Sequence, residues 1–125
     1  MSERRALVAE DSLLILLALE MLLEMHQVAI VGPASTVEEA RALAQTGGFD
    51  IAILDINLHD EMVFPVADLL RQRGVPLIFT TGYAPGEMLP PRFAGTPCIQ
   101  KPYDADDLMA LVEQAFAAAR LAPVA

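Results

Sequence analysis

Short apolar runs alternate with longer amphipathic segments along most of the chain, and few folds accommodate this alternation. Runs of strand length lie at 6–9, 28–31, 51–54, 77–80 and 98–100. Segments with helical periodicity lie at about 13–25, 37–46, 63–72 and 104–121. A chain that alternates strands and helices forms a parallel sheet with helices on both faces, because crossovers between parallel strands are right-handed. We therefore expect an α/β fold with a doubly wound, five-stranded parallel sheet.

Residues that start or stop helices lie at the expected boundaries. Ser12 is placed to cap the first helix, and Thr36 opens a capping region for the second, which ends at Gly47 and Gly48. Residues 83–97 break the pattern, because six prolines and glycines leave no run long enough for a stable helix. We expect a short or absent helix there.

Composition excludes several classes of protein. The length of 125 residues favours one domain. The net charge of −9 argues against a nucleic-acid surface. The single cysteine of the chain, Cys98, cannot form an internal disulfide or hold zinc by itself. The most apolar stretch, 13–25, contains Glu20 and Glu24 and is too short to span a membrane. The first residues lack the apolar core of a secretion signal, so we expect a soluble cytoplasmic protein.

Polar side chains follow four of the predicted strands. Glu10 and Asp11 follow the first strand, Asp55 the third, Thr81 the fourth and Lys101 the fifth. The carboxyl ends of parallel strands meet at one edge of the sheet, where ligands bind near the reversal of strand order. Each residue alone could be an ordinary loop cap, but three clustered carboxylates repel one another unless a cation neutralises them. Hard oxygen ligands favour Mg²⁺, and a cation, an ammonium and a hydroxyl together suit phosphoryl transfer. No glycine-rich loop typical of ATP or NAD binding occurs.

The set Glu10-Asp11, Asp55, Thr81 and Lys101-Pro102, in this order, resembles the receiver domain of bacterial two-component response regulators. The resemblance runs from about residue 5 to residue 119 and implies a flavodoxin-like (βα)5 fold, with one receiver domain over 1–125. It implies that Asp55 accepts a phosphoryl group from a sensor histidine kinase or a histidine phosphotransfer protein. Such a module signals through a downstream protein target and is not an enzyme in the usual sense.

The resemblance also implies roles for the residues around Asp55. Asp11, Asp55 and the backbone carbonyl of Asn57 would ligate Mg²⁺, and Glu10 would act through a metal-bound water. Thr81 would be the switch hydroxyl and Lys101 the phosphate clamp, with a cis peptide bond before Pro102.

A narrower resemblance rests on three segments: Phe79-Thr80-Thr81-Gly82-Tyr83, Asp55-Ile56-Asn57-Leu58 and Phe64-Pro65-Val66-Ala67-Asp68. They are similar to stand-alone receivers of alphaproteobacteria that carry a Phe-Ala-Thr-Gly-Tyr motif, with Thr80 here in place of alanine. Tyr83 and Tyr103 are the aromatic residues expected near the site. A switching role and simple coverage of the sheet edge remain open for both.

The chain departs from the receiver pattern in two places. Cys98 stands three residues before Lys101, where receivers usually carry the aromatic residue that moves with the switch hydroxyl. Residues 84–97 replace the usual fourth helix, which weakens any expectation of a dimer. We expect this segment to be mobile and to order on phosphorylation or partner binding.

The first helix predicts a docking surface near the acidic residues. At 100° per residue, the positions expected to face the core are Ile15, Ala18, Leu19 and Leu22. Those expected on the opposite face are Leu13, Leu16, Leu17, Glu20 and Glu24. Exposed leucines there would contact a kinase, with Leu13 and Leu17 as the chief contacts. The alternative is that the helix is buried more completely.

Two other functions compete with the phospho-acceptor. A receiver-like binding module without phosphorylation would explain Cys98 and the missing helix, but it would have no use for mutually repelling carboxylates. A small phosphatase with an aspartyl nucleophile would need a second aspartate two residues later, where this chain has Asn57. His26 and His59 are expected to be surface residues.

Overall fold

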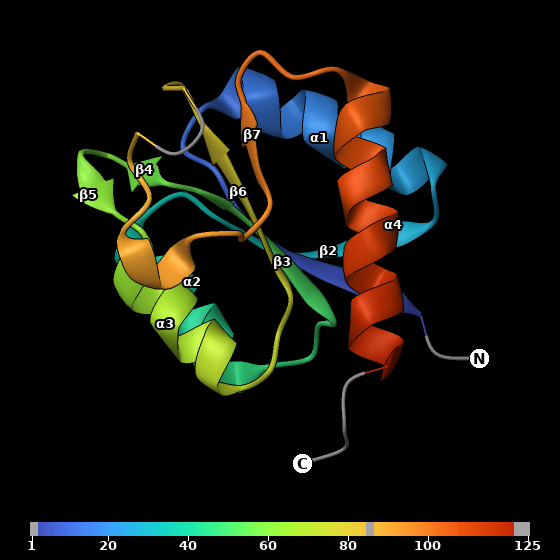
Figure 1. The fold of residues 1–125 in the computed structure, drawn as a ribbon. Coiled ribbons are helices and arrows are strands. Elements are labelled where there is room, and N and C mark those ends of the chain that lie inside the picture. Colours follow the sequence, from blue (N-terminus) through green and yellow to red (C-terminus); the bar gives the residue numbers. More distant parts are fainter. Residues whose placement is uncertain (1–2, 85–86, 122–125) are drawn as a thin grey trace.

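A parallel sheet with helices on both faces forms the centre of the computed structural model, which describes residues 3–84 and 87–121. Its strand order is β2-β1-β3-β6-β7 (Figure 1). These strands are β1 (Arg4–Ala9), β2 (Val28–Ala34), β3 (Ile51–Asp55), β6 (Leu77–Thr81) and β7 (Cys98–Gln100). All four pairings are parallel, and the strand order reverses between β1 and β3. The predicted doubly wound five-stranded sheet is confirmed.

Two helices pack on each face of the sheet. One layer contains α1 (Leu13–Met25) and α4 (Ala105–Leu121), and the other contains α2 (Val37–Thr46) and α3 (Phe64–Gln72) (Figure 1). The first four residues of β3 are at most 1% exposed, as a strand covered on both faces requires. The predicted caps are present, since Ser12 Oγ accepts from the Ile15 N–H and Thr36 Oγ1 accepts from the Glu39 N–H. No helix in the described part of the chain is long and apolar enough to cross a membrane.

Strand β2 is longer than the sequence predicted, because it continues through Gly32 and Pro33 to Ala34. The pairing with β1 shifts after Leu7, and Gly32 has a φ of +103° at this irregularity. A Cβ at Gly32 would lie 3.0 Å from the Ala34 nitrogen, so a side chain would not fit. Pro33 is tolerated because β2 is an edge strand and the missing N–H breaks no ladder there.

The predicted rotation of α1 was partly wrong. The helix packs on the sheet through Leu16, Leu19 and Leu23, whereas Ala18 is exposed. These three residues follow an i, i+3, i+7 spacing, which turns the buried face away from the prediction. Only two of the thirteen residues of α1 are polar, so the periodicity could not define which apolar side faces the sheet.

The segment between β6 and β7 contains a single 3₁₀ turn, η1 (Pro91–Phe93), in its described part. The expected absence of a helix there is confirmed for the described residues, while 85 and 86 lie outside them. Phe93 is fully buried between Phe64 and Phe79, with ring centroids at 5.7 and 5.3 Å. The mobility of residues 84–97 stays a prediction, and the full burial of Phe93 argues against it at that residue.

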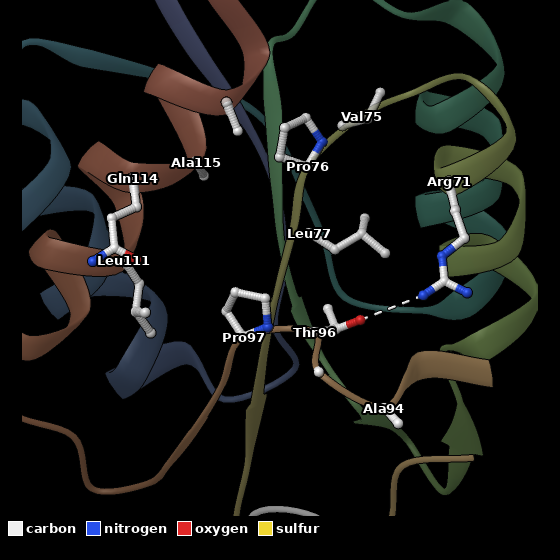
Figure 2. A pocket seen from close by; sticks show the side chains of 12 residues that line it. Arg71, Val75, Pro76, Leu77, Ala94, Thr96, Pro97, Leu111, Gln114 and Ala115 are labelled. Atoms are coloured by element: carbon white, nitrogen blue, oxygen red, sulfur yellow. Dashed lines mark hydrogen bonds between the residues drawn. The ribbon is translucent and has the colours of Figure 1, made fainter. Parts of the chain in front are cut away.

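A groove of about 600 Å³ lies beside this segment, at the amino ends of β6 and β7 (Figure 2). Leu111 and Gln114 of α4 line one wall, and Arg71 of α3 lies across from them with its guanidinium beside Thr96. The groove is therefore at the opposite end of the sheet from Glu10, Asp11 and Asp55.

Candidate functional site

Three carboxylates meet at the carboxyl ends of β1 and β3. Oxygens of Glu10, Asp11 and Asp55 lie within 4.8 Å of one another. Glu10 and Asp55 are buried and Asp11 is half-buried. The strand order reverses at this point of the sheet, so the predicted convergence occurs where an open parallel sheet offers a crevice.

The ammonium of Lys101 bridges two of these carboxylates. Its Nζ donates to Asp55 Oδ2 at 2.9 Å and to Glu10 Oε1 at 3.1 Å. Lys101 directly follows β7, and its backbone N–H donates to the Thr81 carbonyl at 2.7 Å, which holds it against β6. One ammonium among three ionised carboxylates leaves a charge of 1 − 3 = −2. The donor set and this charge both fit one divalent cation with hard oxygen ligands.

The pKa values of Asp55 and Asp11 are shifted in opposite directions. Burial raises the pKa of Asp55 to about 7, and the charge of Glu10 adds to this rise while Lys101 opposes it. Burial also acts on Asp11, but hydrogen bonds from the His59 backbone and with Glu10 outweigh it, so the pKa of Asp11 lies below its usual value. Without a further cation, the site therefore resists full ionisation at Asp55.

We expect the protein without Mg²⁺ to lose stability as the pH rises from about 4 to about 7. In this window folded Asp55 keeps a proton that the unfolded chain has released, so the free energy of unfolding falls with pH. At about 1.4 kcal/mol per pKa unit, and with the charge shared with Lys101 and Glu10, the loss is on the order of 2–4 kcal/mol. Urea unfolding near pH 5 and near pH 8 measures it, and Asp55→Asn should flatten the dependence. Equal pH dependence in the two proteins would contradict the assignment.

The other predicted site residues surround this cluster. Thr81 is buried at the end of β6, and its Oγ1 accepts from the Tyr83 N–H at 3.1 Å. Tyr83 is half exposed, at 50%. Pro102 follows Lys101 through a cis peptide bond, as expected. Tyr103 is partly buried, and burial, with the nearby charge of Glu10, raises its pKa.

An apolar cavity of about 450 Å³ adjoins the site between the start of α1 and the segment after β7. Its lining comprises Ile15, Ala18, Lys101, Pro102 and Tyr103. Leu13 and Leu17 lie on the same helix and are 69% and 49% exposed, as predicted. Leu16, predicted to share that face, is buried instead. Leu14, Met21 and Met25 extend the exposed apolar surface along α1.

A small hairpin in the loop after Asp55 was not predicted. It pairs β4 (Asn57–Leu58) with β5 (Glu61–Met62), and its turn is formed by His59 and Asp60. The His59 N–H donates to Asp11 Oδ2 at 3.0 Å, although the imidazole side chain is on the surface as expected. Two short segments in which polar and apolar residues alternate, separated by two residues, could have indicated the hairpin. The two turn residues are His-Asp, however, and not the usual Asn-Gly or Asp-Gly signal.

This fold and this edge define the class: a doubly wound sheet with an acidic cluster and a lysine at its carboxyl edge is typical of phospho-accepting signalling domains. Residues 6–113 match the model of the response regulator receiver domain, and the chain belongs to that family. Receiver domains are signalling modules of two-component systems, and they bind Mg²⁺ at an acidic pocket.

Solved and curated relatives agree with this family. SdrG from Sphingomonas melonis Fr1 is 38% identical, with a TM-score of 0.77, over 96% of this chain and 99% of SdrG. PhyR from Brucella abortus is 29% identical, with a TM-score of 0.78, over 93% of this chain and 49% of PhyR. The transcriptional regulatory protein PdtaR of Mycobacterium tuberculosis is 29% identical over 115 residues, which are 90% of this chain and 56% of PdtaR. The chain thus spans little more than half the length of that curated relative.

Proposed function

We propose that this chain accepts a phosphoryl group on Asp55 from a phosphohistidine of a sensor histidine kinase or a histidine phosphotransfer protein. The buried Asp55 carboxylate, held by Lys101 inside the acidic cluster, is the observation that carries this proposal. The phosphorylated chain would act through protein contacts, as a relay, a phosphate sink or a regulator of a downstream target. SdrG supports the proposal, because a BeF₃-activated conformation of that relative has been solved.

In the proposed transfer, an Asp55 carboxylate oxygen forms a bond to phosphorus as the bond from phosphorus to the imidazole nitrogen breaks. The imidazole keeps that electron pair. Lys101 already contacts Asp55 Oδ2 and would offset charge on the phosphoryl oxygens, while the Thr81 hydroxyl would donate to one of them. Bound Mg²⁺ would supply the remaining positive charge.

Four residues of this edge are proposed to hold the Mg²⁺. Asp11, Asp55 and the Asn57 carbonyl are the direct ligands, and Glu10 acts through a water. The residual charge of the cluster supports this assignment, as does the position of Glu10, whose two oxygens are already bonded to Lys101 and the Ser12 N–H.

Addition of beryllofluoride tests the function directly, because it forms a phosphoryl-like adduct with an acceptor carboxylate. Mg²⁺ alone should shift amide resonances of its ligands, and beryllofluoride added with Mg²⁺ should produce a further set of shifts that extends to Thr81 and Lys101. Beryllofluoride without Mg²⁺ should produce none. A spectrum that beryllofluoride does not change, in the presence of Mg²⁺, would favour the alternative of a binding module that is not phosphorylated. Cys98, in place of the usual aromatic residue, and the missing fourth helix give that alternative its support.

Polar replacement of Leu13 and Leu17 should slow phosphoryl transfer from the kinase without unfolding the domain. Both leucines are exposed beside the acidic edge, so their loss removes apolar contact area on a partner and little of the core. We expect the Leu13→Ser/Leu17→Ser variant to lose at least about tenfold in transfer rate, since burying one leucine is worth about 1.5–3 kcal/mol and about 1.4 kcal/mol is a factor of ten. Met25→Ser is the matched control, because Met25 is 74% exposed at the far end of α1. An unchanged transfer rate in the double variant, or an equal loss of rate in the control, would contradict the proposal that Leu13 and Leu17 contact the kinase.

A further inference from the structure

The β4–β5 hairpin closes the loop that follows Asp55, and its turn has an unfavourable backbone. His59 and Asp60 have φ values of 47° and 65°. Positive φ at both central residues is typical of a type I′ turn, in which glycine is preferred because a Cβ costs about 1 kcal/mol or more per residue. Strain of this kind persists where the surrounding structure holds the turn in place.

Buried residues on both sides hold this turn. Leu58 and Val63 are both fully buried, and the Val63 N–H donates to the Ile56 carbonyl at 2.8 Å. The exposed turn therefore has little freedom to move relative to the sheet. A main-chain donor fixed in this way cannot rotate away as a side-chain donor could.

The hairpin supplies main-chain donors to two carboxylates of the cluster. The Asn57 N–H donates to Asp55 Oδ1 at 3.2 Å, and the His59 N–H donates to Asp11 Oδ2 at 3.0 Å. Asp11 lies 48 residues before His59 in the sequence, so this bond ties the loop after β3 to the loop after β1. Asp11 is the most exposed of the three carboxylates, and it has the most to gain from such a restraint.

We propose that the His59–Asp60 turn positions Asp11 for Mg²⁺ through the His59 main-chain N–H, while the His59 imidazole takes no part. This inference rests on the proposed Mg²⁺ site. His59 is a positioning residue, since it acts on the cation only through Asp11. Hydrogen-bonded partners of metal-ligating carboxylates typically contribute 10–100-fold to metal affinity.

Backbone replacement at His59 tests the proposal. Incorporation of the α-hydroxy acid of histidine at position 59 converts the amide to an ester, which removes the N–H donor and also weakens the Leu58 carbonyl as an acceptor. We expect the Kd for Mg²⁺, measured by calorimetry on the full chain, to rise at least about tenfold. The same ester at Thr96 is the matched control, because that N–H donates to the Phe93 carbonyl at 3.0 Å far from the cluster. His59→Gly keeps the donor and removes the imidazole, so its Kd should stay within about twofold.

A second variant covers the case in which the ester destabilises the fold. In this variant four glycines replace His59 and Asp60, so the fixed two-residue turn is lost. Both positions are exposed, and added loop length is tolerated there. We expect the same loss of Mg²⁺ affinity with a folded domain.

The outcomes separate this inference from the proposed function. If the wild-type protein binds Mg²⁺ and both the ester and the glycine-loop variants bind it with the same Kd, the inference is overturned while the proposed function stands. A His59→Gly variant as weak as the ester would also overturn it, by assigning the effect to the side chain. A wild-type protein that does not bind Mg²⁺ would overturn both the inference and the metal site.

Discussion

Replacement of Asp55 by asparagine is expected to reduce Mg²⁺-dependent labelling by a small phosphodonor to background. The neutral amide is isosteric with the carboxylate, but it is a very poor nucleophile and cannot form the acyl phosphate. The fold should tolerate the change, because the amide removes one of three clustered negative charges and keeps the volume of a buried side chain. Labelling followed by intact-protein mass spectrometry measures the result as an added mass of one phosphoryl group.

Asp60→Asn is the control for this experiment. Asp60 is an exposed carboxylate in the same loop and takes no part in the cluster, so labelling should remain at the wild-type level. The pH dependence of stability gives a second check, since the asparagine variant lacks the group whose pKa is near 7. Normal labelling of a folded Asp55→Asn protein would place the acceptor elsewhere and would remove the basis of the proposed function.

Truncation of Phe93 to alanine is expected to cost about 3–5 kcal/mol of stability, a large part of the 5–15 kcal/mol typical of a domain. Phe93 is fully buried and packs against Phe64 and Phe79. Guanidinium groups of Arg71 and Arg92 lie 4.4 and 5.0 Å from its ring centroid. The Phe93 side chain thus anchors the segment 84–97, which stands in place of a helix, to the core beneath α3. Urea unfolding followed by circular dichroism measures the loss.

Arg92→Ala is the control that distinguishes the contribution of the buried Phe93 ring to stability from that of the exposed side chains around it. Arg92 forms a two-bond pair with Asp68 at 2.9 and 3.0 Å, but both side chains are substantially exposed, so the loss of stability should be far smaller than that of Phe93→Ala. A Phe93→Ala variant that costs no more than Arg92→Ala would show that the segment is not anchored. Fast amide exchange at Phe93 and Thr96 in the wild-type protein would indicate the same.

The acidic edge could be predicted from the sequence because its residues lie at the end of a strand or directly after one. A parallel sheet brings the ends of its strands together, so the positions of Glu10, Asp55 and Lys101 in the chain were enough to predict that they meet. The strands themselves were recognisable because burial on both faces requires continuous apolar runs.

Residues whose surroundings depend on packing could not be placed in the same way. Leu16 and Ala18 exchanged their predicted positions because α1 is apolar on nearly every side. Phe93 lies in a stretch of prolines and glycines with no periodicity, so nothing in the sequence indicated that it completes the core.

By itself, the sequence determined the order along the chain of the helices and the five sheet strands, the sheet edge that bears the acidic cluster and the identity of the groups there. The tertiary structure alone decided the rotation of α1, the anchoring of Phe93 and the bond from the His59 main chain to Asp11. The physical reason is distance along the chain. Periodicity and capping are local and can be read from neighbouring residues, whereas these three features are contacts between residues far apart in sequence, which form only when the helices and loops pack together on the sheet.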